Sequence, residues 1–192
     1  MFICNGRFCV VEELTTGNDR VLFNLMLTNA NEYRFFVSDE EVPESFEVFQ
    51  TKLQFWFSHG RISQFLVRNK HDDYVGTIFF YGHNSFSNSI KCSCFFIPSA
   101  RGQLCVMESL GMVLNFARLQ LKATEIIFSV YMENLAMLRL ATKLGAEQQA
   151  LETSAVNPQR RTIEFVLDEH VLNRIERKLQ QLRGYLAQVH NQ

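Results

Sequence analysis

The sequence predicts a domain of the α/β (α+β) class, in which helices cover a mixed sheet. Three observations support this class. Hydrophobic residues make up 47% of the chain and charged residues 20%, the balance of an ordinary folded domain. Stretches with the period of a helix alternate with runs typical of β-strands. In the middle of the chain a strand, a helix, a strand and a helix follow one another, the order of a parallel crossover.

The length and the charge limit the expected partners. A chain of 192 residues suits one domain with a sizeable core. The net charge of −1 provides no basic surface for a phosphate backbone, so we expect no nucleic-acid partner. The first residues lack the pattern of a signal peptide, and no run approaches the roughly 20 apolar residues that span a bilayer. We therefore expect a cytoplasmic protein without a membrane partner.

The five cysteines show neither a metal-binding pattern nor a disulfide pattern. They lack Cys-x-x-Cys spacing and a nearby histidine pair, so we expect reduced thiols and no metal. Cys92 and Cys94 lie two residues apart on a predicted strand and therefore share one face, where we expect them to be buried. The full set is Cys4, Cys9, Cys92, Cys94 and Cys105.

The chain begins with a predicted hairpin and a short helix. Two apolar-rich runs, 2–4 and 7–11, are joined by Asn5-Gly6, a dipeptide that suits a two-residue type I′ turn. From about residue 18 to 27 apolar side chains recur at helical spacing. Asn18 or Asp19 can cap this helix.

A second helix and three strands come next. Pro43 suits a first helical position, and apolar side chains then recur every three or four residues until Gly60 stops the helix. Three runs of strand composition follow, at 62–69, 75–81 and 90–97, with polar loops between them. A meander of three antiparallel strands is the simplest interpretation.

The centre of the chain supplies the crossover. Residues 103–119 are apolar nearly all round, so this helix must be covered on most sides. A strand at 125–131 and a helix at 135–144, ended by Gly145, complete the unit. The strands 90–97 and 125–131 should therefore be parallel neighbours.

The last part of the chain predicts a second hairpin and a terminal helix. Strands near 148–154 and 162–167 flank a turn at Asn157-Pro158, and we place the end of the core domain at residue 168. An apolar stripe in 169–192 then predicts an amphipathic helix. This helix either folds back on domain 1–168 or forms a dimer contact or a lid. The stripe consists of Val171, Ile175, Leu179, Leu182, Leu186 and Val189.

The junction around residues 95–103 is the strongest candidate for a binding site. A strand stops at Pro98, and Arg101-Gly102 opens the long helix. The first turn of a helix has unpaired N–H groups and a positive dipole end, so it can hold a phosphate without a large basic patch. The alternative is an ordinary strand-to-helix turn with a solvated Arg101.

The residues of this junction resemble the GNAT acyltransferase family. Its motif, strand and Val-x-Pro-x-x-Arg-Gly-x-Gly-x-Gly/Ala and helix, is matched by Phe96, Pro98, Arg101 and Gly102. Glu108 fits a Thr-Glu-Ala stretch in the branch of ribosomal-protein and amino-sugar N-acetyltransferases. Residues 133–145 resemble the second motif of that branch, Glu-Asn-x-x-Ser/Ala-x-x-Leu-x-x-Lys-x-Gly-Phe.

The resemblance implies a fold and a reaction. The fold is a mixed sheet of about seven strands with helices on both faces, in which strands 90–97 and 125–131 splay apart to hold the pantetheine arm. The reaction is transfer of an acetyl or other acyl group from acyl-coenzyme A (acyl-CoA) to a primary amine by direct attack, without a metal. The implied cofactor-binding residues are Phe96, Ile97, Arg101, Gly102, Gln103, Leu104, Cys105, Val106 and Asn134.

Four positions depart from the pattern of the family. Leu104 and Val106 replace small residues, which would be strained if the loop required positive φ but harmless in the first turn of an ordinary helix. Ala141 replaces a tyrosine that protonates the leaving thiolate in many relatives. Lys91 lies near the position of a glutamate base, so the general base stays unassigned.

Asn134 has two expected roles. It can cap the helix that begins at Leu135, and the resemblance gives it a tentative catalytic role in ordering water or the cofactor near the thioester. Tyr81 and His83, at the end of a predicted strand, can either face this cleft or lie exposed.

Two alternatives to a short-chain enzyme stay open. Phenylalanines in the first half of the chain can line a pocket for a long acyl chain, although core packing explains most of these phenylalanines equally well. In that case an acyl carrier protein can replace CoA as the donor. Alternatively, the domain keeps the fold as a catalytically degenerate binding module. The acceptor amine is a small molecule, a sugar nucleotide or a protein N-terminus. The phenylalanines are Phe46, Phe49, Phe55, Phe57, Phe79 and Phe80.

Overall fold

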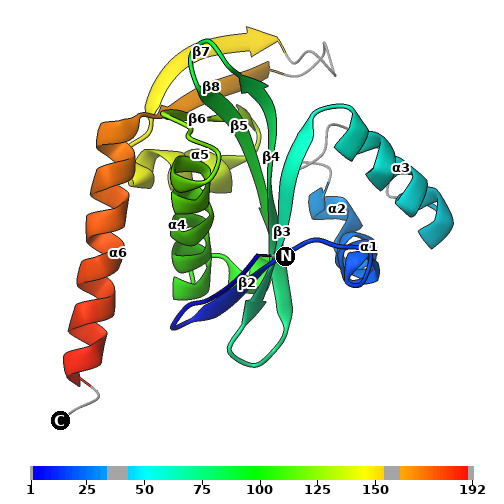
Figure 1. The fold of residues 1–192 in the computed structure, drawn as a ribbon, viewed down its shortest axis with the longest axis horizontal. Helices are drawn as coiled ribbons and strands as arrows, with labels where there is room; N and C mark the ends of the chain where they lie inside the picture. The colour runs from blue at the N-terminus through cyan, green and yellow to red at the C-terminus, as the bar shows by residue number, and fades with distance from the viewer. Residues whose placement is uncertain (1, 34–42, 154–160, 190–192) are drawn as a thin grey trace.

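The structure is a computed structural model that describes residues 2–33, 43–153 and 161–189. Its centre is an eight-stranded sheet in the order β1-β2-β3-β4-β5-β6-β8-β7 (Figure 1). All neighbours are antiparallel except β5 and β6. The mixed α/β fold is thereby confirmed, with one strand more than the expected seven. The strands are β1 (Ile3–Asn5), β2 (Cys9–Glu13), β3 (Arg61–Asn69), β4 (Tyr74–Asn84), β5 (Ser89–Phe96), β6 (Glu125–Tyr131), β7 (Glu147–Thr153) and β8 (Arg161–Leu167).

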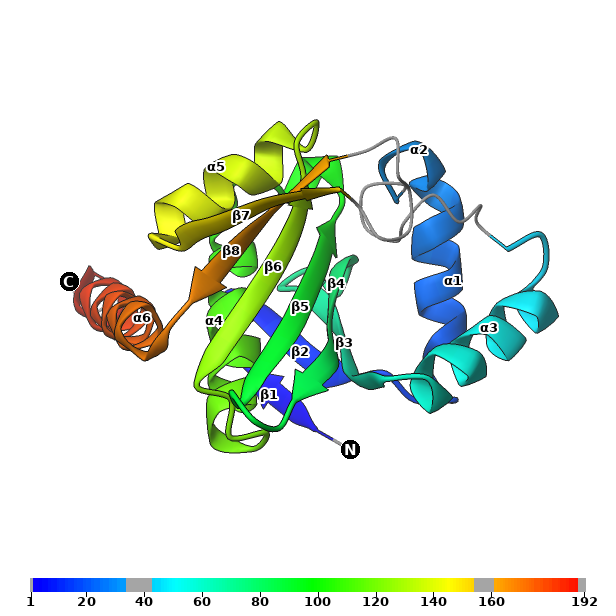
Figure 2. The ribbon, with the colours of Figure 1, turned by 90° about the horizontal axis from the view of Figure 1, so that it is seen from above.

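Helices cover both faces of this sheet, as Figures 1 and 2 show. On one face lie α1 (Asp19–Thr28), α2 (Ala30–Tyr33) and α3 (Phe46–Ser58). On the other face lie α4 (Leu104–Leu119), α5 (Leu135–Leu144) and α6 (Glu169–Val189). Each face has its own apolar core, because alternate residues of a strand point to opposite faces. No helix of the described residues is both long and apolar enough to cross a bilayer.

The N-terminal hairpin is present, but its predicted turn is wrong. Asn5 pairs with Val10, so four residues separate the paired positions, and Gly6 does not adopt a positive φ. The turn closes instead around the carboxylate of Glu108 from α4, which accepts the backbone N–H groups of Arg7 (2.9 Å) and Phe8 (2.6 Å). A long-range partner therefore replaces the local preference of Asn-Gly.

Two predicted helix starts also need correction. Helix α3 begins at Phe46 rather than at Pro43, because the hydroxyl of its N-cap residue Ser45 accepts a hydrogen bond from the N–H of Val48 (3.3 Å). Asn18 occupies the N-cap position of α1 but makes no side-chain cap there; its Oδ1 accepts the N–H of Thr15 (2.7 Å). Gly60 follows the end of α3 as expected, with a φ of +109°.

The central helix α4 organises the fold. Its side chains are buried over most of its length, as its all-round apolar sequence predicts. A single turn of 3₁₀ helix, Pro98–Ala100, separates it from β5, so the strand stops at the proline as expected. The junction thereby places the exposed start of α4 beside the end of β5.

The parallel pair β5 and β6 forms a splay. Their pairing runs over three residues, Ser89 to Lys91 against Glu125 to Ile127, and ends there although both strands continue. This confirms the parallel neighbours expected from the crossover. Beyond Lys91 the facing edges of the two strands open away from each other, so their backbone polar groups can pair with a ligand.

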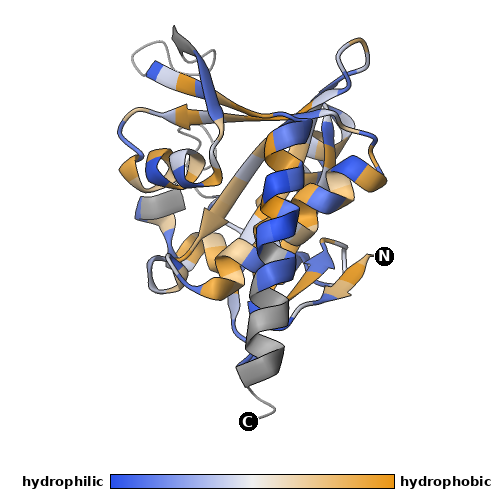
Figure 3. Cartoon of the chain, turned by 90° about the vertical axis from the view of Figure 1, so that its left-hand side faces the viewer, coloured by the Kyte–Doolittle hydropathy of each residue, from blue (hydrophilic) through white to orange (hydrophobic). Residues whose placement is uncertain are grey.

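The last strands and α6 complete the sheet and one helical layer. Strand β8 lies beside β6 and β7 forms the edge, while the predicted turn at Asn157-Pro158 lies outside the described residues. Helix α6 packs along α4, where Arg118 donates to Glu176 (3.0 Å). Val171, Leu172 and Ile175 are buried, and polar residues face outward (Figure 3). The side chains of Leu179, Leu182, Leu186 and Val189 lie outside the described set.

Candidate functional site

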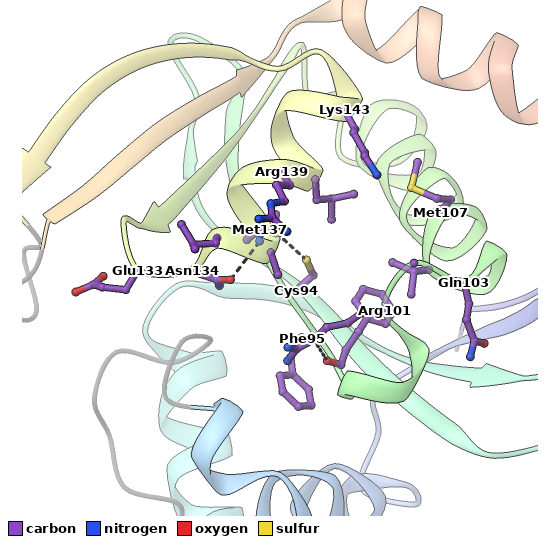
Figure 4. Close-up of a pocket in the computed structure, with 16 residues that line it drawn as sticks. Cys94, Phe95, Arg101, Gln103, Met107, Glu133, Asn134, Met137, Arg139 and Lys143 are labelled. Carbon is purple, nitrogen blue, oxygen red and sulfur yellow. Dashed lines mark hydrogen bonds between the residues drawn. The ribbon is translucent and has the colours of Figure 1, made fainter.

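A cavity of about 780 Å³ opens at the splay. Its walls are the end of β5, the start of α4 and one side of α5, as Figure 4 shows. This volume is typical of a pocket for a small molecule or cofactor. The lining residues are Cys94, Phe95, Phe96, Arg101, Gly102, Gln103, Val106, Met107, Glu133, Asn134, Leu135, Ala136, Met137, Arg139, Leu140 and Lys143.

The start of α4 forms one wall of this cavity. Gly102 adopts a φ of +84°, which turns the chain into the helix, and Gln103 takes the N-cap position. Leu104 and Val106 have no positive φ, so they belong to the first turn of an ordinary helix and are not strained. Val106 is buried and lines the cavity, whereas Leu104 is 42% exposed and points elsewhere.

The side chains before α4 brace the loop. Arg101 Nε donates to the carbonyl of Phe96 (3.1 Å), and Gln103 Nε2 donates to the carbonyl of Ser99 (2.7 Å). Arg101 therefore stabilises the end of β5 as well as contributing a positive charge to the cavity.

Asn134 holds the start of α5. Its Oδ1 accepts the N–H of Met137 (3.2 Å), which confirms the expected N-cap. Met137 in turn lies against β5, with its sulfur 3.8 Å from Sγ of Cys94 (Figure 4). The start of α5 is thus fixed to the splayed part of β5.

The thiols near the cavity are poor nucleophiles. All five cysteines are free, and burial raises the pKa of Cys94 to about 12 and that of Cys92 well above its usual range. Burial also raises the pKa of Cys105. A covalent intermediate on these thiols is therefore disfavoured at neutral pH.

A row of polar side chains lies on the face of the sheet opposite α4. This polar row consists of Tyr81, Lys91, Ser129 and Glu164. Glu164 on β8 accepts hydrogen bonds from Lys91 Nζ (2.9 Å) and from Ser129 Oγ (3.0 Å). Burial alone would raise the pKa of Glu164, but these two hydrogen bonds and the charge of Lys91 together lower it. Tyr81 pairs with Lys91 across β4 and β5, and burial raises the pKa of Tyr81 to about 12. Glu164 is thus a carboxylate, and Tyr81 a neutral phenol, at pH 7.

The polar row lies beside the splay. Lys91 is the last residue of β5 that pairs with β6, and Ser129 follows the last paired residue of β6 by two. Both side chains belong to the face opposite α4, because Ile90, Cys92, Ile126 and Phe128 belong to the core under α4. The cavity and the polar row therefore lie on opposite faces of the sheet, on either side of the splay.

Comparison with known protein families identifies the family of the chain. The Acetyltransferase (GNAT) domain matches residues 13–147, well over half of the chain. The chain belongs to the GNAT acetyltransferase family. No curated protein sequence matches it.

Solved structures support the GNAT fold. A candidate acetyltransferase from T. thermophilus aligns with a TM-score of 0.77 at 16% identity, over 93% of this chain and 95% of that one. Spermidine N-acetyltransferase from Vibrio cholerae, in complex with CoA and spermine, aligns with a TM-score of 0.71 at 16% identity, over 85% and 97%. At such identities the likeness extends to the fold.

Six of the nine GNAT cofactor positions predicted from the sequence line the cavity. The other three do not: Ile97 lines a second cavity of about 610 Å³ beside α1, Leu104 is exposed, and Cys105 is buried. The six are Phe96, Arg101, Gly102, Gln103, Val106 and Asn134.

Sequence reasoning missed several residues of this GNAT site. Arg139 and Lys143 line the cavity from α5, and their i,i+4 spacing in the sequence indicates one face of a helix. Glu164 was also missed, because no local pattern shows that β8 lies next to β6. Met107 and Cys94 line the cavity without a sequence signal that sets them apart.

The six phenylalanines considered for a long acyl chain do not form a common pocket. Phe49 and Phe79 are buried in the core beneath α1 and α3, whereas Phe80 belongs to the core on the other face. Phe55 is 56% exposed. None of the six lines either of the two cavities described above, so packing explains the buried ones.

Ala141, which stands where many GNAT relatives have a tyrosine, is buried away from the cavity. Ala141 is 1% exposed and does not line the cavity. Within the described ranges, no three His, Cys, Asp or Glu side chains are grouped to hold a metal ion.

Proposed function

We propose that this GNAT domain transfers an acyl group from acyl-CoA to a primary amine. The observation that carries the proposal is the splay between β5 and β6, which opens onto the cavity at the start of α4. An extended pantetheine arm can lie along β5 beyond Lys91, where the pairing with β6 ends, as an added strand would. The thioester then lies between the cavity and the polar row.

The reaction is a direct attack. The ammonium group first loses one proton to solvent, and its nitrogen then bonds to the thioester carbonyl. The C–S bond breaks to release the thiolate, and the nitrogen loses a second proton to solvent to leave the neutral amide. A backbone N–H of β5 beyond Lys91 is suited to stabilise the oxyanion of the tetrahedral intermediate. Because Ala141 provides no acid, the thiolate leaves unprotonated; a thiol pKa of about 8.5 makes this feasible.

The acceptor amine approaches from the face opposite α4. There Glu164 remains a carboxylate at neutral pH, suited to bind an ammonium group, while Lys91 and Ser129 fix its position. We assign Glu164 to positioning the amine rather than to removing its proton, because its lowered pKa makes it a weak base. Asn134 holds α5 in place and contacts the thioester end of the cavity.

An acetyl or other short acyl group is the donor group we favour. None of the six phenylalanines considered for a long acyl chain lines either of the two cavities, so the long-chain alternative loses the observation that motivated it. We also propose that the protein belongs to the ribosomal-protein and amino-sugar branch of the family and that it is cytoplasmic. We further propose a domain of residues 1–168 followed by 169–192, in which α6 packs on the domain or forms a dimer contact.

Release of free thiol from acyl-CoA tests the function. Purified protein is incubated with acetyl-, octanoyl- or palmitoyl-CoA, or with an acyl carrier protein, and with a panel of polyamines, amino sugars and peptides with free N-termini. We expect amine-dependent release of thiol with acetyl-CoA. Failure to bind any acyl-CoA, measured by thermal shift, would contradict the proposal.

A binding module without turnover is the second candidate. It is favoured by two observations: the branched Val106 lines the cavity at the start of α4, where the family motif has a small residue, and Ala141 supplies no acid. Tight binding of CoA together with no thiol release for the whole amine panel would support this function instead.

A further inference from the structure

The side chain of Lys91 reaches into the mouth of the splay, on the face opposite α4. Lys91 is the last residue of β5 that pairs with β6, and its Nζ donates to Oε1 of Glu164 (2.9 Å). Glu164 belongs to β8, on the far side of β6, and pairs with Ser129, which lies beyond the part of β6 that pairs with β5. The Lys91 side chain therefore crosses over β6 toward the open part of the splay.

Contacts at both ends hold this side chain in place. An added β-carbon at Gly82 would lie 3.7 Å from Cγ of Lys91, so the aliphatic stem lies beside this glycine. At the other end, Nζ shares Oε1 of Glu164 with the hydroxyl of Ser129, which donates to the same oxygen (3.0 Å). The Lys91 side chain is still 39% exposed, so solvent reaches it. A primary amine that is both held and accessible meets the geometric requirement for a nucleophile.

The Lys91 amine occupies the position that the proposed function gives to the acceptor. That function places the acceptor's ammonium group against Glu164 and the thioester between the cavity and the polar row. Lys91 supplies an ammonium group to the same carboxylate from within the chain. A bound donor therefore brings its thioester next to a primary amine before any acceptor arrives from solution.

We propose that Lys91 is a modification site, acylated on Nζ by the donor bound to the same chain. This inference rests on the proposed function and adds an acceptor inside the protein. The Lys91 ammonium group loses one proton to solvent, and its nitrogen bonds to the carbonyl carbon of the thioester. The C–S bond breaks, its electron pair leaves with the thiolate of CoA, and the nitrogen loses a second proton to solvent. The products are a neutral amide on Lys91 and free CoA.

Acylation of Lys91 changes the charge of the polar row. The amide nitrogen carries no charge, so the ion pair with Glu164 is lost. Glu164 keeps the hydroxyl of Ser129 as a donor, and an ammonium group from solution no longer competes with Lys91 for its carboxylate. Because each chain has a single Lys91, release of CoA thiol without an added amine should stop after about one thiol per chain.

Mass spectrometry of the wild-type protein, incubated with acetyl-CoA and no added amine, tests the assignment. The intact mass counts the acetyl groups per chain. Trypsin does not cleave after an acetylated lysine, so acetylation of Lys91 yields a peptide of residues 71–101 in place of 71–91 and 92–101. Lys122 and Lys178 are exposed and do not line the cavity, so they measure ordinary chemical acetylation in the same sample. Lys91→Arg keeps the positive charge, and Lys122→Arg is the matched control.

We expect Lys91 to be acetylated roughly tenfold or more faster than Lys122 and Lys178, because a positioned amine reacts faster than a free one. At saturating acetyl-CoA the rate per chain should not change when the protein is diluted. Excess desulfo-CoA, which has no acyl group, should occupy the donor site and slow acetylation of Lys91 alone. Lys91→Arg, with folding verified by circular dichroism, should lose the fast acetylation and the thiol released with it, whereas Lys122→Arg should keep both.

The outcomes separate this inference from the proposed function. If acetyl-CoA raises the thermal midpoint but Lys91 is acetylated no faster than Lys122 and Lys178, the inference is overturned while the proposed function stands. Equal acetylation of Lys91 with and without desulfo-CoA also overturns the inference, because the donor then reacts from solution. If acetyl-CoA does not bind the protein at all, the proposed function fails and the inference with it.

Discussion

The carboxylate of Glu108 lies directly against Gly6. Glu108 is 3% exposed, and a β-carbon at Gly6 would overlap its carboxylate oxygen. Through the N–H groups of Arg7 and Phe8 this side chain ties the first hairpin to the first half of α4. A residue that fits a sequence motif of the family thus has a structural role here, since it does not line the cavity.

Replacing Glu108 by Gln should destabilise the fold. A glutamine side chain has one acceptor oxygen and a donor group, so one of the two backbone N–H groups is left unpaired, at a cost of about 1–3 kcal/mol. Urea denaturation gives the free energy of unfolding. The exposed Glu147→Gln is the control, and equal stability of the two variants would show that the hairpin does not depend on this carboxylate.

Replacing Gly6 by Ala should act on the same contact. The methyl group forces the buried carboxylate away from its donors, and overpacking of this kind costs about 1–3 kcal/mol. In combination with Glu108→Ala the loss should be less than the sum of the two single losses, because the overlap disappears. Additive losses would contradict a direct steric effect.

Replacing Gly102 by Ala should strain the entry to α4. An added β-carbon would meet no atom within 4 Å, so its cost arises from the φ of +84° alone and amounts to about 1–2 kcal/mol. Gly17→Ala is the matched control, since Gly17 is exposed and lacks a positive φ. A loss of unfolding free energy in the control but not in Gly102→Ala would reverse the assignment.

Glu164→Gln should remove a pH-dependent part of the stability. The lowered pKa of Glu164 means that its carboxylate stabilises the fold above the usual glutamate pKa of 4.5, and that this contribution is lost as the pH falls through the lowered value. The unmodified protein should exceed the variant by at most about 1 kcal/mol at pH 7, because the pair is partly exposed. Denaturation at pH 7 and pH 3 measures whether the difference disappears.

Arg61 provides a spectroscopic prediction. Its guanidinium is buried between the rings of Trp56 (4.4 Å) and Phe79 (4.0 Å) and donates to Gln64 Oε1 (2.7 Å). Arg61→Met should cost about 2–4 kcal/mol, because Gln64 loses its donor and the cation–π contacts vanish. It should also change the fluorescence of Trp56, the single tryptophan of the chain. Arg177→Met on the exposed side of α6 should change neither.

Local patterns were sufficient to predict most elements. The alternation of strands, the all-round apolar helix α4 and the stop at Gly145 depend on residues close in the chain, and all are confirmed. The wrong turn at Asn5-Gly6 depends on Glu108, a hundred residues away. Tertiary contacts of this kind cannot be derived from neighbouring residues.

The site was only partly predictable for the same reason. The residues of the strand-to-helix junction follow one another in the sequence, so their motif could be read directly. Glu164 and Lys91 come together through the order β5-β6-β8, and a single sequence does not reveal strand order. For Arg139 and Lys143 the shared helix face was predictable, but the cavity beside that face was not.

The short contact between β5 and β6 also divides the sheet mechanically. Among the residues that the structure describes, three pairs join the strands β1 to β5 to the strands β6, β8 and β7. The backbone hydrogen bonds at this seam therefore resist bending less than those of the longer strand pairs. Amide hydrogens at the seam should therefore exchange faster than those of β3 and β4. A ligand bound between β5 and β6 would contact both strands and stabilise the seam, so it should slow the exchange of amide hydrogens in both strands.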